Sequence, residues 1–265
     1  MTHTQIPATL TAPQLPQAIG SGISALASTH LQVDISPYPG MEEGDLIELF
    51  WNNCFAASRK VTAGKIGTFT HLWVPESFVQ DGPARVHYQV LQIGHGPMRS
   101  AATLVRVKTN YPGGLPSSHL NHERGDENQN LAPVGLPETI RRYGVNSCQV
   151  RRGIPLKIEP YLNMSSGDAI TLRWGDVRLD LPKIHAKNVG LAVQVWVPSQ
   201  VIIEAGDDCR LEVTYCILDR VGNNSRWAPA RTLRIAACAS AAPTRSASPA
   251  PGYQPRRFGS PCEPG

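Results

Sequence analysis

Residues Pro37–Trp51 read PYPGMEEGDLIELFW, and residues Pro160–Trp174 read PYLNMSSGDAITLRW. The Pro, Tyr, Met, Gly, Asp, Ile, Leu and Trp of the first stretch return in the second, each 123 positions later. Such a regular register indicates an internal duplication, because unrelated stretches do not align in this way by chance. The chain therefore contains one structural unit twice.

The shared pattern predicts a tight turn that leads into a β-strand. Glycine tolerates the positive φ that a reversal often needs, and the aspartate after it can accept hydrogen bonds from nearby backbone amides. Ile47, Leu49 and Trp51 share one face of the first copy, and the second copy alternates likewise from Ile170 to Trp174. A period of two with one apolar face is typical of an antiparallel strand. We therefore expect both tryptophans to face the core, in preference to forming ligand-stacking surfaces.

The duplication continues on the far side of the tryptophans. The sequence LWVP at Leu72–Pro75 and the sequence VWVP at Val195–Pro198 keep the offset of 123. Each predicted strand ends at the proline, which has no N–H for a ladder hydrogen bond. The copies then drift by about four residues, a length change that a surface connection tolerates. The later predicted strands are 85–90 and 103–107 in the first copy, and 211–217 and 232–235 in the second.

The composition is that of a chain rich in turns. Its 265 residues include 23 Gly and 23 Pro, and 41% are hydrophobic, which allows packed cores and favours many short strands. The net charge of +4 is spread along the sequence, so nucleic-acid binding is not expected. No apolar run is long enough to span a bilayer. Residues 1–30 lack the pattern of a secretory signal.

We expect two domains, a connection and a tail. The first domain is predicted at residues 8–109 and the second at 131–236, each with a Pro-rich lead-in strand. Residues 110–130 begin with NYPGGLP and continue as a polar segment, which predicts an exposed linker. Residues 237–265 are dominated by Ala, Pro, Ser, Gly and Arg, and we expect a disordered tail because burial would not offset its ordering.

Six cysteines do not repeat with the unit. A disulfide essential to the fold would occur in both copies, so we expect free or buried thiols rather than a disulfide framework. Cys209 and Cys216 differ by an odd number, which would place them on opposite faces of one strand. No Cys-x-x-Cys pair is present to suggest zinc. The six positions are 54, 148, 209, 216, 238 and 262.

Two polar motifs lie in the predicted linker. His119, His122, Glu123 and Asp126 would suit a metal ion in a helix. The surrounding Pro and Gly residues favour a solvated connection instead. Arg124-Gly125-Asp126 is a tripeptide that some adhesion receptors bind, and three-residue motifs are also common by chance.

Enzymatic chemistry has little support in the sequence. Asp45 and Asp168 recur and could be imagined as an acid–base pair, but they occupy equivalent turns of different domains, and a structural role is favoured. The sequence has no nucleophile elbow, phosphate loop or dinucleotide fingerprint. Glycosylation acceptor patterns at Asn163 and Asn223 are given no role. We therefore predict no catalytic, cofactor-binding or metal-binding residues.

The pattern Pro-Tyr-x-x-Met-x-x-Gly-Asp-x-Ile-x-Leu-x-Trp, the Val-Pro strand end and the later Val-x-Tyr strand resemble bacterial immunoglobulin-like domains. Such modules occur in tandem in long bacterial surface and adhesin-type proteins, and the resemblance covers about residues 8–109 and 129–236. It implies a β-sandwich of roughly seven strands for each copy, with Trp in the second strand and Tyr in the penultimate one. The inter-sheet Cys pair of antibody domains is missing. A fold of this kind implies a spacer or a binding surface and does not fix the role.

We hypothesise an all-β, non-enzymatic protein of two tandem immunoglobulin-like β-sandwich domains that mediates adhesion or binding at or outside a bacterial cell surface. Its ligand would be a protein or a glycan, with no cofactor and no nucleic acid. The predicted contacts are the loops Asn52–Lys65 and Gly175–Asn188 and the turns near Gly94 and Gly222. The alternative is a structural subunit of a filament, fibre or tail-like particle, assembled through sheet edges or termini. An enzyme, such as a hydrolase with a site on the sandwich, is the third class.

Overall fold

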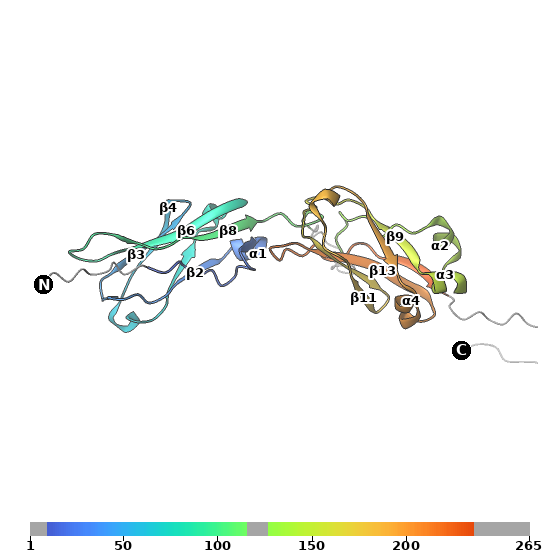
Figure 1. Ribbon diagram of the computed structural model, residues 1–265, viewed down its shortest axis with the longest axis horizontal. Coiled ribbons are helices and arrows are strands. Elements are labelled where there is room, and N and C mark those ends of the chain that lie inside the picture. The colour runs from blue at the N-terminus through green and yellow to red at the C-terminus, as the bar shows by residue number, and fades with distance from the viewer. Residues whose placement is uncertain (1–9, 116–126, 236–265) are drawn as a thin grey trace, which may run out of the picture.

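The structure, a computed structural model, describes residues 10–115 and 127–235 of the chain. Two bodies lie end to end along the long axis of the molecule (Figure 1). One body encloses buried apolar residues between Leu10 and Val107, and the other encloses buried apolar residues between Leu131 and Ile235. Each body therefore has a hydrophobic core of its own, and we call them unit 1 and unit 2.

Unit 1 consists of two β-sheets. The larger sheet has the strand order β1-β8-β6-β3-β4, with β7 paired to β6, and the smaller sheet pairs β2 with β5. Strands β1 and β8 are parallel, and the other pairs are antiparallel. The elements of unit 1 are β1 (Gly22–Ser24), α1 (Ala25–Ser28), β2 (Leu31–Ile35), β3 (Leu46–Trp51), β4 (Cys54–Lys60), η1 (Ala63–Lys65), β5 (Thr70–Val74), η2 (Glu76–Phe78), β6 (Gly82–Leu91), β7 (Met98–Arg99) and β8 (Thr103–Lys108).

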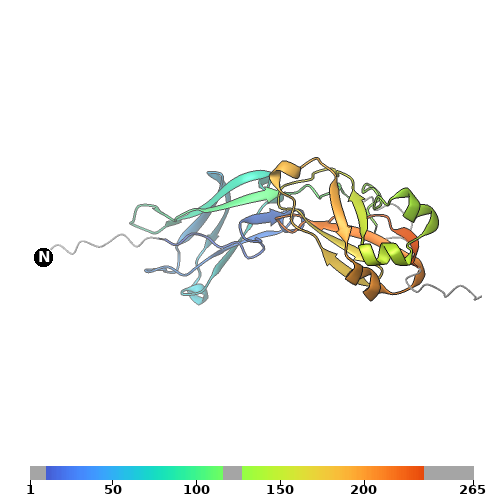
Figure 2. The ribbon, with the colours of Figure 1, turned by 45° about the vertical axis from the view of Figure 1, so that its right-hand side comes forward.

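Unit 2 repeats this arrangement. Its larger sheet has the order β11-β10-β13-β14, and its smaller sheet pairs β12 with β9. The helices α2, α3 and α4 lie at the end of unit 2 that points away from unit 1, in both views (Figures 1 and 2). The elements of unit 2 are α2 (Glu138–Tyr143), α3 (Ser147–Arg152), β9 (Ile154–Ile158), β10 (Ala169–Trp174), β11 (Val177–Asp180), η4 (Ala186–Asn188), β12 (Val193–Val197), α4 (Ser199–Ala205), β13 (Asp208–Leu218) and β14 (Arg231–Ile235).

The repeated tryptophans lie in the cores, as predicted. Trp51 is 2% exposed and Trp174 is fully buried. In unit 2, Trp174 is in the second strand and Tyr215 is in the penultimate strand, as the resemblance implies. Two sheets that pack their apolar faces over such residues form a β-sandwich, so the predicted all-β sandwich fold is confirmed. The helices of unit 2 are additions that the prediction omitted.

The drift between the copies has a structural cause. In unit 1 the connection from β5 to β6 contains η2, which has 3 residues, and in unit 2 the connection from β12 to β13 contains α4, which has 7 residues. On either side of this connection the strand pairing is equivalent, because Leu49 lies opposite Tyr88 and Leu172 lies opposite Tyr215. The additional residues therefore lengthen a 3-10 turn into a helix and leave the sheets unchanged.

The repeated Tyr and Asp form a buried hydrogen bond that fixes the turn before β3 and β10. Tyr38 Oη donates to Asp45 Oδ2 at 2.8 Å, and the amide of Glu42 donates to the same oxygen at 3.0 Å. Tyr161 Oη donates to Asp168 Oδ2 at 2.9 Å. Burial raises the pKa of the Asp168 carboxyl, whose Oδ1 has no hydrogen-bond partner. Both aspartates therefore have the structural role in a turn that the sequence pattern favours.

Two segments predicted as ligand-binding loops contain strands. The segment Asn52–Lys65 includes β4, and the segment Gly175–Asn188 includes β11. Both strands are edges of their sheets; β4 has no fully buried residue, and β11 is only 4 residues long. Such strands lack the long alternation of buried and exposed residues that identifies a strand in a sequence. The loop prediction is therefore wrong at these two places.

The described ends of the predicted linker, residues 110–130, are partly packed against unit 2, whereas Asn110, Leu115 and Asn130 are exposed. Gly113 is buried and donates its amide to a carbonyl oxygen of unit 2 at 2.7 Å. The fully buried Asn128 donates its side-chain amide to the carbonyl oxygens of Gly114, at 3.4 Å, and Ser225, at 3.0 Å. Hydrogen bonds thus satisfy these polar groups inside unit 2, which their composition alone does not reveal.

The predicted lead-in strands are reduced to single bridges. Gln14 pairs with Asp34 in unit 1, and Gly135 pairs with Lys157 in unit 2. The proline residues around these bridges lack the N–H groups that a longer ladder needs.

Replacement of Asp168 by Asn is expected to change how stability depends on pH. Because the folded-state pKa of Asp168 lies above its ordinary value of 3.8, its contribution to stability falls as the pH rises from about 4 through the raised pKa. Each unit of pKa shift corresponds to about 1.4 kcal/mol. Asn does not ionise, so D168N should gain stability relative to the wild type across that interval. Urea unfolding at a series of pH values measures the difference, and a difference independent of pH contradicts the prediction.

Candidate functional site

A groove of about 540 Å³ runs along unit 2 between β11 and β12. Leu179 and Leu181 contribute to one wall, and Leu191, Val195 and Trp196 contribute to the other. The exposed fractions of Leu191 and Trp196 are 57% and 58%. The groove therefore presents large apolar side chains to solvent in one place, as binding surfaces do.

The groove exists because two sheet edges face each other there. Among the described residues, strand β12 pairs only with β9 and β11 only with β10, so each strand has one side without a strand partner there. An unpaired edge presents a row of N–H and C=O groups that need other partners. The two sheets of unit 2 thus meet along a line of open backbone groups.

The register shows which backbone groups of β12 point into the groove. Lys157 on β9 exchanges both of its backbone hydrogen bonds with Gly135, at 2.7 and 3.0 Å, on the side away from β12. Gln194 lies opposite Lys157, so its N–H and C=O point away from β9 and toward the groove. Trp196 lies two residues further along and directs its backbone groups the same way.

The β11 wall offers similar groups. The amide of Leu181 donates to the carbonyl oxygen of Ile170 on β10 at 2.9 Å. The N–H and C=O of Asp180, one residue earlier, therefore point away from β10 and toward the groove. Pro182 has no N–H, so it supplies no donor after Asp180 on this wall.

The same place in unit 1 is closed by an arginine. Arg59 of β4 donates from Nη1 to the carbonyl oxygen of His71 on β5 at 3.1 Å. Its guanidinium carbon lies 5.7 Å from the ring centre of Trp73, a distance typical of a cation–π contact. One side chain thus satisfies an open carbonyl, covers the tryptophan and bridges the two sheet edges.

The described part of unit 2 has no such bridge. Arg59 lies opposite Ile47 on β3, and Leu181, whose amide bonds to the equivalent Ile170 on β10, holds that place on β11. Gln194 and Trp196 return at the places of the histidine and the tryptophan. The leucine side chain has no hydrogen-bond donor, so the Gln194 carbonyl is not capped as in unit 1. Trp196 is accordingly more exposed, at 58% against 41% for Trp73.

Trp196 is supported by a glycine. Gly153 has a φ of +81°, and a Cβ at this position would lie 2.5 Å from the indole Nε1 of Trp196 and 2.7 Å from the carbonyl oxygen of Val197. Only glycine permits this close approach and this backbone conformation. The indole is therefore held against the backbone between α3 and β9 while more than half of its surface remains open.

Charged side chains lie at the mouth of the groove. Lys183 and His185 line it and are exposed. The carboxylate of Asp180 already accepts hydrogen bonds from Arg178 Nε at 2.9 Å and from Thr171 Oγ1 at 2.6 Å. The rim therefore favours a ligand that carries negative charge near Lys183.

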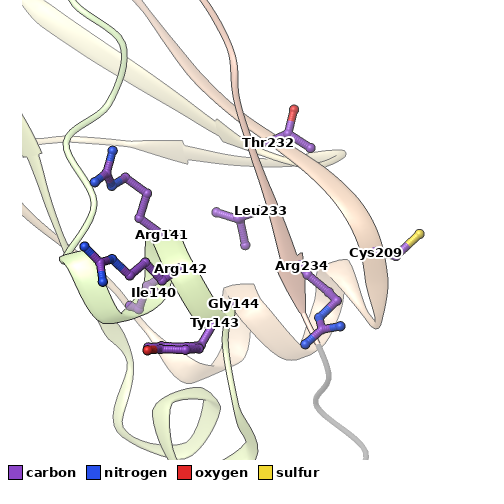
Figure 3. Close-up of a pocket in the computed structure, with 9 residues that line it drawn as sticks. All are labelled: Ile140, Arg141, Arg142, Tyr143, Gly144, Cys209, Thr232, Leu233 and Arg234. Carbon is purple, nitrogen blue, oxygen red and sulfur yellow. The ribbon is translucent and has the colours of Figure 1, made fainter.

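A second cavity, of about 300 Å³, lies at the far end of unit 2 between α2 and the strands β13 and β14 (Figure 3). Figure 3 shows Arg141 and Arg142 on one side and Arg234 and Cys209 on the other, with polar ends that do not converge. Both arginines of α2 pair with Glu138, at 2.6 and 2.5 Å. This cavity therefore does not present a concentrated charge to a ligand.

The turn after β13 that contains Gly222 docks on unit 1. The amide of Ala25, at the start of α1, donates to Asn223 Oδ1 at 2.8 Å, and Asn223 Nδ2 donates to the carbonyl oxygen of Lys108 at 2.8 Å. Lys108 Nζ lies 3.0 Å from Oδ2 of Asp219, whose side chain is fully buried. One polar network, which we call the junction, thus joins the end of β8 in unit 1 to unit 2.

The junction corrects the prediction of a binding turn near Gly222. Asn223 is 2% exposed and its side chain is occupied by hydrogen bonds, so this turn is not open to a ligand or to glycosylation. The turn near Gly94 is exposed, with Ile93 at 96%. It lies at the other end of unit 1 and stays a prediction.

The other candidate residues are placed as follows. Four cysteines, at positions 54, 148, 209 and 216, are free thiols, as expected. Cys238 and Cys262, the polar motifs within residues 119–126 and the tail at 237–265 lie outside the described residues. Within the described ranges, no group of three or more His, Cys, Asp or Glu side chains is arranged to hold a metal ion. In the same ranges, no helix is both long and apolar enough to cross a membrane.

Sequence reasoning found one wall of the groove and missed the other. The predicted loop Gly175–Asn188 supplies the β11 wall, but Trp196 is predicted only as part of a strand. A signal was available in the loss of Arg59, since neither Pro182, at the offset of 123, nor Leu181, at the same strand register, has a charged side chain. The importance of this position becomes clear only in the fold, where β4 faces β5 and β11 faces β12. The strands of each pair belong to different sheets and are not hydrogen-bonded to each other.

Comparison with known proteins gives low similarity. No protein-family model matches the chain, and no curated protein gives a significant match. Similar solved structures include a 1.5-MDa bacterial ice-binding adhesin, at 15% identity and a TM-score of 0.34, over 86% of this chain and 65% of that one. Fibronectin(III)-like modules of Clostridium thermocellum CbhA match at 8% identity and a TM-score of 0.41, over 83% and 90%. A tetra-tandem repeat from the extending region of a large adhesion protein matches at 11% identity and a TM-score of 0.34, over 87% and 50%.

Loss of the Lys108 cation is expected to loosen the junction. In a Lys108→Met variant the buried carboxylate of Asp219 has no ion pair, and removal of one member of a buried pair costs about 2–5 kcal/mol. Small-angle X-ray scattering should show one extended shape for the wild type and a mixture of shapes for the variant. The matched control is Lys157→Met, which breaks an exposed pair with Glu159 and should leave the shape unchanged. Identical scattering from K108M and the wild type would rule out this role.

Proposed function

We propose that the chain is a non-enzymatic binding protein of adhesion type, in which unit 2 binds a protein or glycan ligand in the groove between β11 and β12. The observation that supports this is a difference between two copies of one fold: Arg59 closes the sheet edges of unit 1, whereas Leu181, at the same strand position, leaves those of unit 2 open. The open groove combines an exposed Trp196 with apolar walls and a polar rim. Tryptophans in such surroundings contribute strongly to binding energy.

Opening the groove leaves the sandwich intact. Trp174 is buried in unit 2 as Trp51 is in unit 1, and Val195 and Val197 on β12 point into the core beside the outward Trp196. The binding surface uses the outward Trp196, edge backbone groups, and the partly buried Leu179 and Leu181 at the margin of the core. It can therefore differ between the units while the packing of the core stays the same.

Unit 1 serves as a spacer in this proposal. The junction holds Asp219 and Asn223 of unit 2 against Lys108 and Ala25 of unit 1. The groove is thereby held in a fixed orientation to the rest of the chain, and a preorganised site loses less entropy when it binds. This arrangement fits a protein that holds a ligand at or outside a cell surface.

A structural subunit of a fibre is the alternative function. Fibre growth needs sheet edges or ends that pair between chains. Head-to-tail growth through the junction would require the junction residues of unit 2 to recur in the corresponding turn of unit 1. The sequence has different residues at those positions. By strand register, the corresponding pairs are Asp219 and Gln92, and Asn223 and Gly96. The proposal of a binding protein therefore does not depend on self-assembly.

Replacement of Trp196 by Ala is expected to weaken ligand binding roughly 10- to 30-fold, the loss typical of a central aromatic residue at an interface. Arrays of oligosaccharides and of peptides supply ligands for the wild-type protein, and the affinity of each positive is then measured for the variants. Trp73→Ala is the matched control, because Trp73 occupies the same place in the closed unit 1. Equal losses in both variants, or no ligand for the wild type in either array, would refute the proposed site.

A further inference from the structure

We infer that the ligand of the groove is an extended polypeptide segment, which adds to the free edge of β12 as a further strand. This inference rests on the proposed function, because it names the class of ligand that the same groove binds. It is based on the backbone groups that line the groove, in addition to the apolar walls.

The β12 edge presents donor and acceptor pairs at a regular interval. The N–H and C=O of Gln194 point into the groove, and those of Trp196 follow two residues later. Alternate residues of a strand lie about 6.6–6.8 Å apart. An extended peptide carries its own N–H and C=O groups at the same interval, so one segment satisfies both pairs. The hydroxyl groups of a sugar chain do not alternate donor and acceptor in this way.

The opposite wall sets a preference between the two edges. Asp180 of β11 offers an N–H and a C=O to the groove, and Pro182 adds no donor. A segment in the groove therefore finds more complete pairing along β12 than along β11. Pairing along β12 would extend the smaller sheet of unit 2, which has only two strands.

In unit 1, the equivalent edge on β5 accepts a hydrogen bond from a side chain. The carbonyl of His71, which corresponds to Gln194, accepts a hydrogen bond from Arg59 at 3.1 Å. In unit 1 the guanidinium supplies the hydrogen-bond donor to this carbonyl. In unit 2 a backbone N–H of an added strand would supply it. An arginine at position 181, the register equivalent of Arg59, should therefore compete with a ligand for the same carbonyl.

The walls and the rim indicate which side chains the segment carries. Successive side chains of a strand point to opposite faces, so alternate apolar residues would meet Leu179 and Leu181 on one face. Lys183 at the mouth has no ion pair among the described residues. The matching segment therefore has apolar residues at every second position and an acidic residue near one end.

A selection experiment tests the inference. A displayed library of random peptides of roughly ten residues, the length of a long strand, is selected on immobilised wild-type protein. The enriched peptides are then measured against Leu181→Arg, which places a guanidinium at the strand position that Arg59 has in unit 1. The control is Gln200→Arg, which adds the same side chain on α4 outside the groove. We expect alternating apolar sequences that bind Q200R like the wild type and L181R at least about tenfold more weakly.

Backbone pairing is tested on the same peptides. Methylation of alternate backbone nitrogens removes donors without changing the side chains, so it should abolish binding for one of the two sets of nitrogens only. Amide hydrogen exchange should slow at Gln194 and Trp196 when the peptide is bound. The near-ultraviolet circular dichroism of L181R checks that the variant keeps the native packing.

The outcomes separate this inference from the proposed function. Peptides that bind L181R as well as the wild type, or that tolerate both sets of methylations, overturn the added strand. If oligosaccharides bind in a Trp196-dependent way and no peptide is enriched, the strand is wrong and the groove remains the binding site. If neither peptides nor oligosaccharides bind the wild type, both proposals fail.

Discussion

Every backbone N–H and C=O of a β-sandwich needs a hydrogen-bond partner. A strand at the free edge of a sheet has no neighbouring strand on one side to supply these partners. The surfaces of this protein differ according to how that need is met. In unit 1 the guanidinium of Arg59 reaches the carbonyl oxygen of His71 and spans the gap between the sheets. In unit 2 the gap remains as a groove with apolar walls. At the junction, the side chain of Asn223 bonds to the start of α1 and to the end of β8.

The sequence was sufficient to predict the interior and insufficient to predict the edges. Trp51 and Trp174 could be placed in the core because each ends a run in which every second residue is apolar. Strand β4 could not be recognised, because an edge strand with no fully buried residue does not show the alternation of apolar and polar residues that identifies a strand. The burial of Asn128 was equally hidden, since a polar residue enters the interior only when distant carbonyl groups are there to accept its hydrogen bonds. The groove depends on two edge strands from different sheets that face each other. Only the three-dimensional arrangement reveals that they do.

The choice of polar groups at the junction has a physical consequence. An apolar contact between two ends would hold them together over a range of angles, because the hydrophobic effect has no direction. Asp219 and Asn223 instead accept and donate hydrogen bonds of defined geometry, and Asp219 is fully buried against the Lys108 ammonium. A misaligned contact would leave a buried carboxylate unpaired, which is costly. The polar network therefore selects one relative placement of the units as well as stabilising it.

The same network means that the two halves of the chain are not interchangeable modules. If their order were reversed, the tip of unit 1 would bring Gln92 and Gly96 to the seam. The buried carboxylate of Asp219 and the side-chain amide of Asn223 would both be missing there. Such a permuted protein would be two tethered sandwiches instead of a single stiff body. Copying a unit once more would likewise add length without adding stiffness. Growth of a protein of this design by duplication therefore requires new residues at each seam, in addition to another copy of the fold.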